Sequence, residues 1–86
     1  MIPRCSPKDC LLDVRSAEEF QEGHLEGAQN VAYDRVYEEA HRLAEYERIF
    51  IYCRTGRRAY EAADVLEQLG VKELWVVEQG GMEQFK

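Results

Sequence analysis

The chain has 86 residues, 17 acidic and 11 basic side chains for a net charge of −6, and a composition that is 45% hydrophobic and 33% charged. This length supports one modest hydrophobic core, so we expect a single domain over residues 1–86 and exclude a large second one. An acidic chain without a basic stripe is a poor candidate for binding nucleic acid, and no apolar run approaches the roughly 20 residues that cross a bilayer, so we expect neither nucleic acid nor membrane as a partner.

The first half of the chain alternates strand-like and helix-like patterns. Ser16 followed by Glu19 is a capping-box pattern, which marks the start of a short helix that should stop before Gly23. Apolar side chains recur with a helical period from Val36 to Ala44. The predicted elements are a strand at 11–14, the short helix after Ser16, a turn at 23–28, a brief strand at 30–32 and a helix from 34 to about 46.

The second half repeats the alternation. Residues 49–53 form a continuous run of β-branched and aromatic side chains, which is typical of a central strand buried on both faces. The predicted elements that follow are a helix at 58–69 closed by Gly70, a strand at 73–77, a turn at 79–81 and one more helical turn at 82–86. Strands that alternate with helices indicate βαβ units around a mainly parallel sheet.

The three cysteines are Cys5, Cys10 and Cys53, and an odd count in a short chain argues against a disulfide framework. Their spacing to one another and to the two histidines does not match familiar zinc sites, so we expect no metal. The N-terminus lacks the apolar stretch of a signal peptide. We therefore expect a cytoplasmic protein, with a periplasmic location as the alternative if a leader has been removed.

Cys53 stands at the end of the predicted central strand, and the residues Arg54-Thr55-Gly56-Arg57-Arg58 lead from it into the next helix. In open α/β sheets, ligands bind beyond the carboxyl ends of the strands. A loop there can turn backbone N–H groups inward, and the helix start adds unpaired N–H groups and the positive end of its dipole. Such surroundings favour the thiolate of Cys53, which is the nucleophilic form. Gly56 permits a backbone path that is closed to other residues.

Three arginines, Arg54, Arg57 and Arg58, fall within this short segment of an otherwise acidic chain. Guanidinium groups hold anions well, so we expect them to bind an anionic substrate near the sulfur. The alternative is a solvated helix start next to a cysteine that only packs in the core. The coincidence of strand end, glycine, arginines and helix start favours a catalytic Cys53.

Three separated motifs resemble those of rhodanese-like domains: residues 12–15, 19–20 and 23–31 together form the N-terminal signature, Cys53–Arg58 the active-site loop, and Gly80-Gly81 a later turn. The resemblance covers about residues 11–85. It implies a three-layer α/β/α fold with a mainly parallel sheet of four or five strands and helices on both faces. The fifth strand would be a short first one near residues 2–4.

The resemblance implies a sulfurtransferase in which Cys53 takes a sulfane sulfur from thiosulfate or a persulfide donor and passes it to cyanide or to a thiol, which can be that of a protein. It implies no cofactor, and it assigns substrate binding to Arg54, Thr55, Gly56, Arg57 and Arg58. Asp13 and Arg15 are then structural supports, and we expect Arg15 to pair with a carboxylate, Glu19 being the candidate.

Two other functions stay open at this point. One is a sulfur-relay or regulatory protein-binding module that turns over little free thiosulfate. The other is a small phosphatase or arsenate reductase. These relatives of the rhodaneses have a loop that is one residue longer, with an arginine six positions after the cysteine. Here Ala59 stands at that position and Arg58 at the fifth, so the loop length favours sulfur.

Overall fold

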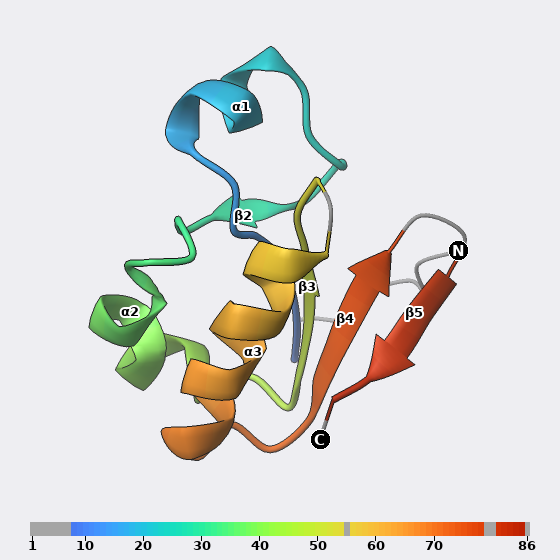
Figure 1. Cartoon of the computed structure of the whole chain (residues 1–86). Coiled ribbons are helices and arrows are strands. Elements are labelled where there is room, and N and C mark those ends of the chain that lie inside the picture. The colour runs from blue at the N-terminus through green and yellow to red at the C-terminus, as the bar shows by residue number, and fades with distance from the viewer. Residues whose placement is uncertain (1–7, 55, 79–80, 86) are drawn as a thin grey trace.

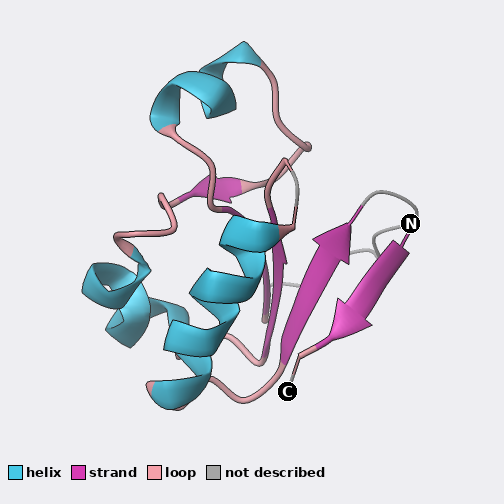
Figure 2. Cartoon of the chain, in the orientation of Figure 1, coloured by secondary structure: helices cyan, strands magenta, loops and turns pink. Residues whose placement is uncertain are grey.

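The computed structural model describes residues 8–54, 56–78 and 81–85, and it shows a sheet flanked by helices (Figure 1). Strands and helices alternate along most of the chain, as Figure 2 shows. The strands are β1 (Asp9–Asp13), β2 (Gln29–Asn30), β3 (Arg48–Tyr52), β4 (Leu74–Glu78) and β5 (Gly81–Gln84). The helices are α1 (Ala17–Glu22), α2 (Val36–Leu43) and α3 (Arg57–Gln68).

The sheet has the strand order β2-β1-β3-β4-β5. The first four strands of this order are parallel, and β5 runs antiparallel to β4. β1 and β3 occupy the interior of the sheet, where Leu12 lies opposite Ile51. Their side chains are buried on both faces, which explains why Cys10–Leu12 and Ile49–Tyr52 are continuous apolar runs and not alternating patterns.

The main core lies between the sheet and the helices α2 and α3, which lie side by side (Figure 1). Leu12, Ile49 and Ile51 of the sheet pack there against Leu43 of α2 and Leu66 of α3, and all five side chains are fully buried. The opposite face carries a smaller cluster of Leu11, Phe50 and Tyr52, with Trp75 and Val77 packed against it. Successive strand residues therefore serve different clusters, as the pleat requires.

Helix α1 lies beyond the carboxyl ends of the central strands (Figure 1) and buries no side chain of its own. Its start is fixed by the predicted capping box, because Ser16 Oγ accepts from the Glu19 amide and Glu19 accepts from the Ser16 amide. After α1, the amide of Leu25 donates to the hydroxyl of Tyr52 at 3.0 Å, which connects the following turn to the second face of the sheet.

Most predicted elements are confirmed within a few residues, and so is the mixed α/β class with four parallel strands. Gly70 closes α3 as predicted, with a φ of +95° and a bond from its amide to the carbonyl of Glu67. The predicted helical turn at 82–86 is wrong, because this segment contributes the strand β5. A single helical turn is costly to nucleate, whereas β4 offers an open edge of backbone groups to pair with.

The fifth strand of the sheet is thus a C-terminal one. The predicted short first strand near residues 2–4 lies outside the described residues, and so does most of the predicted turn at 79–81. None of the helices in the described part of the chain has the length and apolar character needed to cross a membrane.

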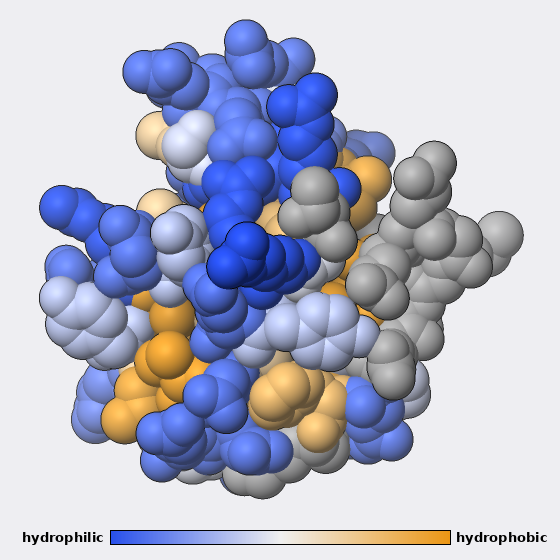
Figure 3. Space-filling view, viewed as in Figure 1, coloured by the Kyte–Doolittle hydropathy of each residue, from blue (hydrophilic) through white to orange (hydrophobic). Residues whose placement is uncertain are grey.

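One face of the molecule is mostly hydrophilic, as Figure 3 shows, with apolar side chains gathered over the neighbouring helices α2 and α3. A shallow hollow there is lined by Tyr37, Ala40, His41, Ala44 and Leu69. It lies on the outer side of the helices, and none of its residues is among the site residues that the sequence predicts.

Candidate active site

Cys53 directly follows β3, and its sulfur faces the first turn of α3. The backbone amides of Gly56 and Ala59 donate to Cys53 Sγ over distances of 3.0 and 3.3 Å. The side chain is partly exposed and packs on one side against the main core. The sulfur is therefore held by two N–H donors and remains open to a reactant, which is the environment that stabilises a thiolate.

Gly56 makes this arrangement possible. It is the residue before α3 and has a φ of +87° and a ψ of −28°, in the left-handed region. A side chain at this position would strain the backbone by about 1–2 kcal/mol. The left-handed turn directs the Gly56 amide back toward the sulfur and starts α3 at Arg57.

The first turn of α3 adds to the field at the sulfur. The helix is 12 residues long and has no acidic side chain in its first turn, so nothing there offsets the positive end of its dipole. Ala59 is completely buried, and its small side chain lets the helix approach the end of β3 closely enough for the amide contact. The predicted juxtaposition of strand end, glycine and helix start is thus present around Cys53.

Arg58 does not lie free for an anion. Its guanidinium donates to both carboxylate oxygens of Glu19, at 3.0 and 3.2 Å. The hydrogen bond from Arg58, followed by those from Ser16, lowers the pKa of Glu19 to about 2. The same bond raises the pKa of Arg58, and the nearby sulfur of Cys53 adds to this shift. The pair joins α1 to the first turn of α3 and so braces the helix start that faces the sulfur.

Arg15 pairs with Asp13 and not with Glu19, which corrects the sequence expectation. Two of the guanidinium nitrogens of Arg15, Nε and Nη2, donate to the Asp13 carboxylate, and the shortest of these bonds joins Nη2 to Oδ2 at 2.8 Å. Asp13 is fully buried, and a buried carboxylate needs a charged partner more than the partly exposed Glu19 does. The hydrogen bond to Asp13 raises the pKa of Arg15. Arg15 Nη2 also donates to the carbonyl of Gly23, so the pair ties β1 to the turn after α1.

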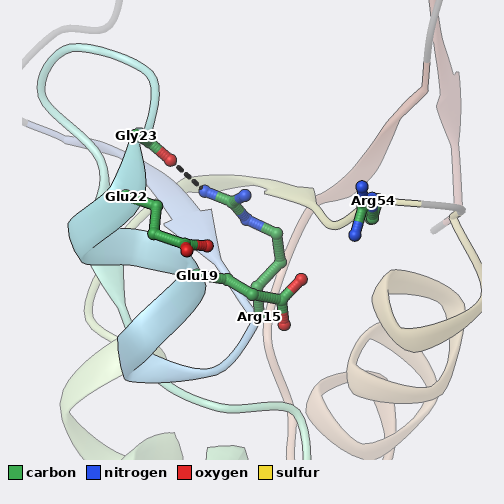
Figure 4. Close-up of a pocket in the computed structure, with 5 residues that line it drawn as sticks. All are labelled: Arg15, Glu19, Glu22, Gly23 and Arg54. Atoms are coloured by element: carbon green, nitrogen blue, oxygen red, sulfur yellow. Dashed lines mark hydrogen bonds between the residues drawn. The ribbon is translucent and has the colours of Figure 1, made fainter.

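The other residues of the loop after Cys53 lie in different surroundings. Arg57 is 87% exposed in its side chain and approaches Glu61 of its own helix only to 3.9 Å. Arg54 instead lines a pocket of about 240 Å³ together with Arg15, Glu19, Glu22 and Gly23 (Figure 4). Thr55 lies outside the described residues. Of the three arginines expected to hold an anion together, the structure places one in a pocket, one in an ion pair and one on the surface.

Sequence reasoning missed Glu22 and the carbonyl of Gly23 as parts of this pocket. Glu22 is the last residue of α1, and nothing in its local pattern indicates that α1 stands over the end of the sheet. His24 lies stacked on the ring of Phe20, and its Nδ1 is 2.7 Å from the Phe20 carbonyl oxygen, so it is a hydrogen-bonded turn residue. Within the described ranges, no cluster of His, Cys, Asp and Glu could hold a metal ion.

Comparison with known proteins gives a consistent picture. The family model of the rhodanese-like domain matches residues 1–86. The chain is 34% identical to the "Putative sulfur carrier protein YrkF" of Bacillus subtilis, over 74% of this chain and 35% of that protein. It is 31% identical to the thiosulfate sulfurtransferase PspE of Escherichia coli, over 69% of this chain and 59% of that protein. The chain thus spans about a third to three fifths of these relatives.

Among solved structures, a rhodanese with anions from E. coli superposes with a TM-score of 0.69 at 26% identity, covering 77% of this chain and 80% of the other. Protein hp1203 of Helicobacter pylori gives a TM-score of 0.70 at 30% identity, covering 79% and 63%. The arrangement of sheet and helices is therefore shared with both.

Proposed function

Because this chain belongs to the rhodanese-like domain family, we propose that it is a sulfurtransferase that carries a sulfane sulfur as a persulfide on Cys53. Family membership and the sulfurtransferases and sulfur carriers among its relatives support sulfur transfer in general. The observation that carries the proposal is the pair of amides, of Gly56 and Ala59, that donate to Cys53 Sγ. Thiosulfate as the donor, and cyanide or a thiol as the acceptor, are the specific parts of the proposal.

In the first step, the Cys53 thiolate attacks the outer sulfur of thiosulfate. A new S–S bond forms to Cys53, the S–S bond within thiosulfate breaks, and sulfite leaves with its electron pair. The dianionic donor has to approach an already negative sulfur. The two amides and the dipole of α3 offset that repulsion because they are fixed in place before the donor arrives.

In the second step, cyanide or a thiolate attacks the terminal sulfur of the persulfide. The S–S bond to Cys53 breaks, and the thiolate of Cys53 returns to its two amide donors. The transfer is thus divided into two displacements through a covalent intermediate, which is nucleophilic catalysis. Neither step needs a general base, a cofactor or a metal.

The loop residues take different parts in this proposal. Arg54 binds the anionic donor from the pocket side, and Arg57 adds positive charge at the surface. Gly56 and Arg58 hold the amides in place, Gly56 through its backbone and Arg58 through its pair with Glu19. Thr55 remains a proposed substrate-binding residue, while Asp13 and Arg15 support the fold. A reducing compartment such as the cytoplasm keeps the thiol of Cys53 available.

Intact mass before and after incubation with thiosulfate tests the proposal. The wild-type protein should gain the mass of one sulfur atom, lose it again on addition of cyanide, and release thiocyanate. The variant C53S should gain none. The matched control is C10A, at the buried Cys10 of β1, which should load as the wild type does. Equal loading of wild type and C53S would overturn the proposal.

The second candidate is a sulfur-relay or regulatory module that receives its sulfur from a protein partner. The 34% identical relative named as a sulfur carrier favours it, as does the exposure of Arg57 toward solvent. In that case a protein persulfide donor would load Cys53, and free thiosulfate would turn over little.

A further inference from the structure

The pocket beside the Cys53 loop has walls of both charges. Arg54 comes from the loop itself, while Arg15, Glu19, Glu22 and Gly23 come from the segment that contains α1 (Figure 4). In Figure 4 the side chains of Arg15, Glu19 and Glu22 stand on one side of the space and Arg54 stands on the other. A site built only for thiosulfate or another dianion would not need carboxylates in its wall.

Two of the four charged side chains in this wall already form ion pairs within the protein. Arg15 is held by the buried carboxylate of Asp13, and Glu19 is held by the guanidinium of Arg58. The side chains of Arg54 and Glu22 form no ion pair and no side-chain hydrogen bond within the described part of the chain. The pocket therefore offers a ligand one free cation and one free anion.

We propose that this pocket binds a small zwitterionic thiol, one that carries an ammonium and a carboxylate as α-amino acid thiols do, and presents it to Cys53 as the sulfur acceptor. Arg54 receives the carboxylate and Glu22 the ammonium. The acceptor role rests on the proposed function, whereas binding of the zwitterion does not. A volume of about 240 Å³ corresponds to some eight water molecules, which suits a free amino acid.

The reaction balances without further reagents. The acceptor thiol loses its proton to solvent, and its thiolate attacks the terminal sulfur of the Cys53 persulfide. The bond between the two sulfurs of the persulfide breaks, Cys53 leaves as the thiolate, and the acceptor becomes a persulfide. The described lining of the pocket does not include Cys53, but Arg54 follows it directly in the chain, so a carboxylate on Arg54 holds the acceptor beside the loop that carries the sulfur.

Binding is tested with unreactive thioethers, so that it does not depend on sulfur transfer. S-methylcysteine carries both charges, 3-(methylthio)propionate only the carboxylate, and 2-(methylthio)ethylamine only the ammonium. Titration of ¹⁵N-labelled protein should show the zwitterion binding up to about fivefold more tightly than either single-charge ligand, as one more ion pair allows. S-methylglutathione, a tripeptide with one ammonium and two carboxylates, tells whether the pocket prefers a free amino acid or a peptide.

Variants assign the two charges. E22Q should reduce the affinity for S-methylcysteine to that for 3-(methylthio)propionate, and R54Q should reduce it to that for 2-(methylthio)ethylamine. The matched control is E18Q, which removes an equal charge from α1 at a residue that does not line the pocket. Equal binding of all ligands, or an equal loss in E18Q and E22Q, would overturn the site.

Transfer is tested separately with protein already loaded with sulfur. Cysteine should discharge the persulfide faster than 3-mercaptopropionate, after correction for their reactivity toward a small persulfide, and E22Q should remove that preference. If the wild-type protein binds the zwitterion but shows no preference for cysteine over 3-mercaptopropionate, the acceptor role alone is overturned. Absence of any loading by a donor would overturn the sulfurtransferase itself and the acceptor role with it, while the binding result would decide the zwitterion site.

Discussion

Cys10 lies on β1 and Cys53 directly follows the neighbouring parallel strand β3, yet their surroundings are opposite. Cys10 is near the amino end of β1, is buried to 1% exposure and packs in the main core. Cys53 follows the carboxyl end of β3, is partly exposed and faces two backbone amides at the start of α3. The comparison teaches that the position at the end of the strand, and not the residue type, gives a cysteine the exposure and the N–H donors that a nucleophile needs.

The largest expected effect is therefore on alkylation. In native protein at neutral pH, iodoacetamide should modify Cys53 at least about 100-fold faster than Cys10, because Cys53 is partly exposed and faces two N–H donors, whereas Cys10 is buried and reacts only after local unfolding. Peptide mapping of a time course measures both rates in one sample. Similar rates for the two cysteines would remove the distinction on which the proposed chemistry depends.

A second prediction asks whether the left-handed turn at Gly56 matters through its backbone conformation alone or through its position beside Cys53. G56A should lower stability by about 1–2 kcal/mol, because a Cβ is placed in the left-handed region. Sulfur loading should fall about tenfold or more, since the turn also directs the amide at Sγ.

The matched control is G70A at the other end of α3, where φ is +95° and no atom stands within 4 Å of an added Cβ. This variant carries a similar backbone cost far from the sulfur, so it should lower stability and leave the loading rate of the folded protein unchanged. Urea denaturation and intact mass measure the two quantities. Equal losses of loading in both variants would mean that general destabilisation, not the direction of the amide, is responsible.

The same contrast explains what the sequence could predict. The corner at Cys53 depends on local signals: an apolar strand, a glycine and a helical period that follow one another. The partner of Arg58 could not be predicted, because Glu19 is 39 residues away and comes close only through the position of α1. For Arg15, two carboxylates were within reach, and the burial of Asp13, a tertiary property, decided between them. The four residues of β5 were too few to show a period.

The smallest expected effect concerns the Glu19–Arg58 pair, which connects α1 to α3, the helix that faces Cys53. Because the pKa of Glu19 is lowered to about 2 from 4.5, its contribution to stability is complete above pH 4.5. It is lost as the pH falls from 4.5 through about 2. E19Q should thus be less stable than wild type at neutral pH, by less than about 1 kcal/mol, as for a partly exposed pair.

The difference between wild type and E19Q should shrink as the pH falls below 4.5, because the unfolded chain then takes up a proton on Glu19 while the folded chain keeps it ionised until about pH 2. Denaturant midpoints at pH 7, 4 and 3 measure this convergence. E61Q is the matched control: the Arg57–Glu61 pair lies on the same helix at 3.9 Å and is largely exposed, so its loss should change stability little at any of these values. A gap between wild type and E19Q that stays constant down to pH 3 would mean that Glu19 acts through the shape of its capping box, and that its charge does not hold α1 against the helix that faces Cys53.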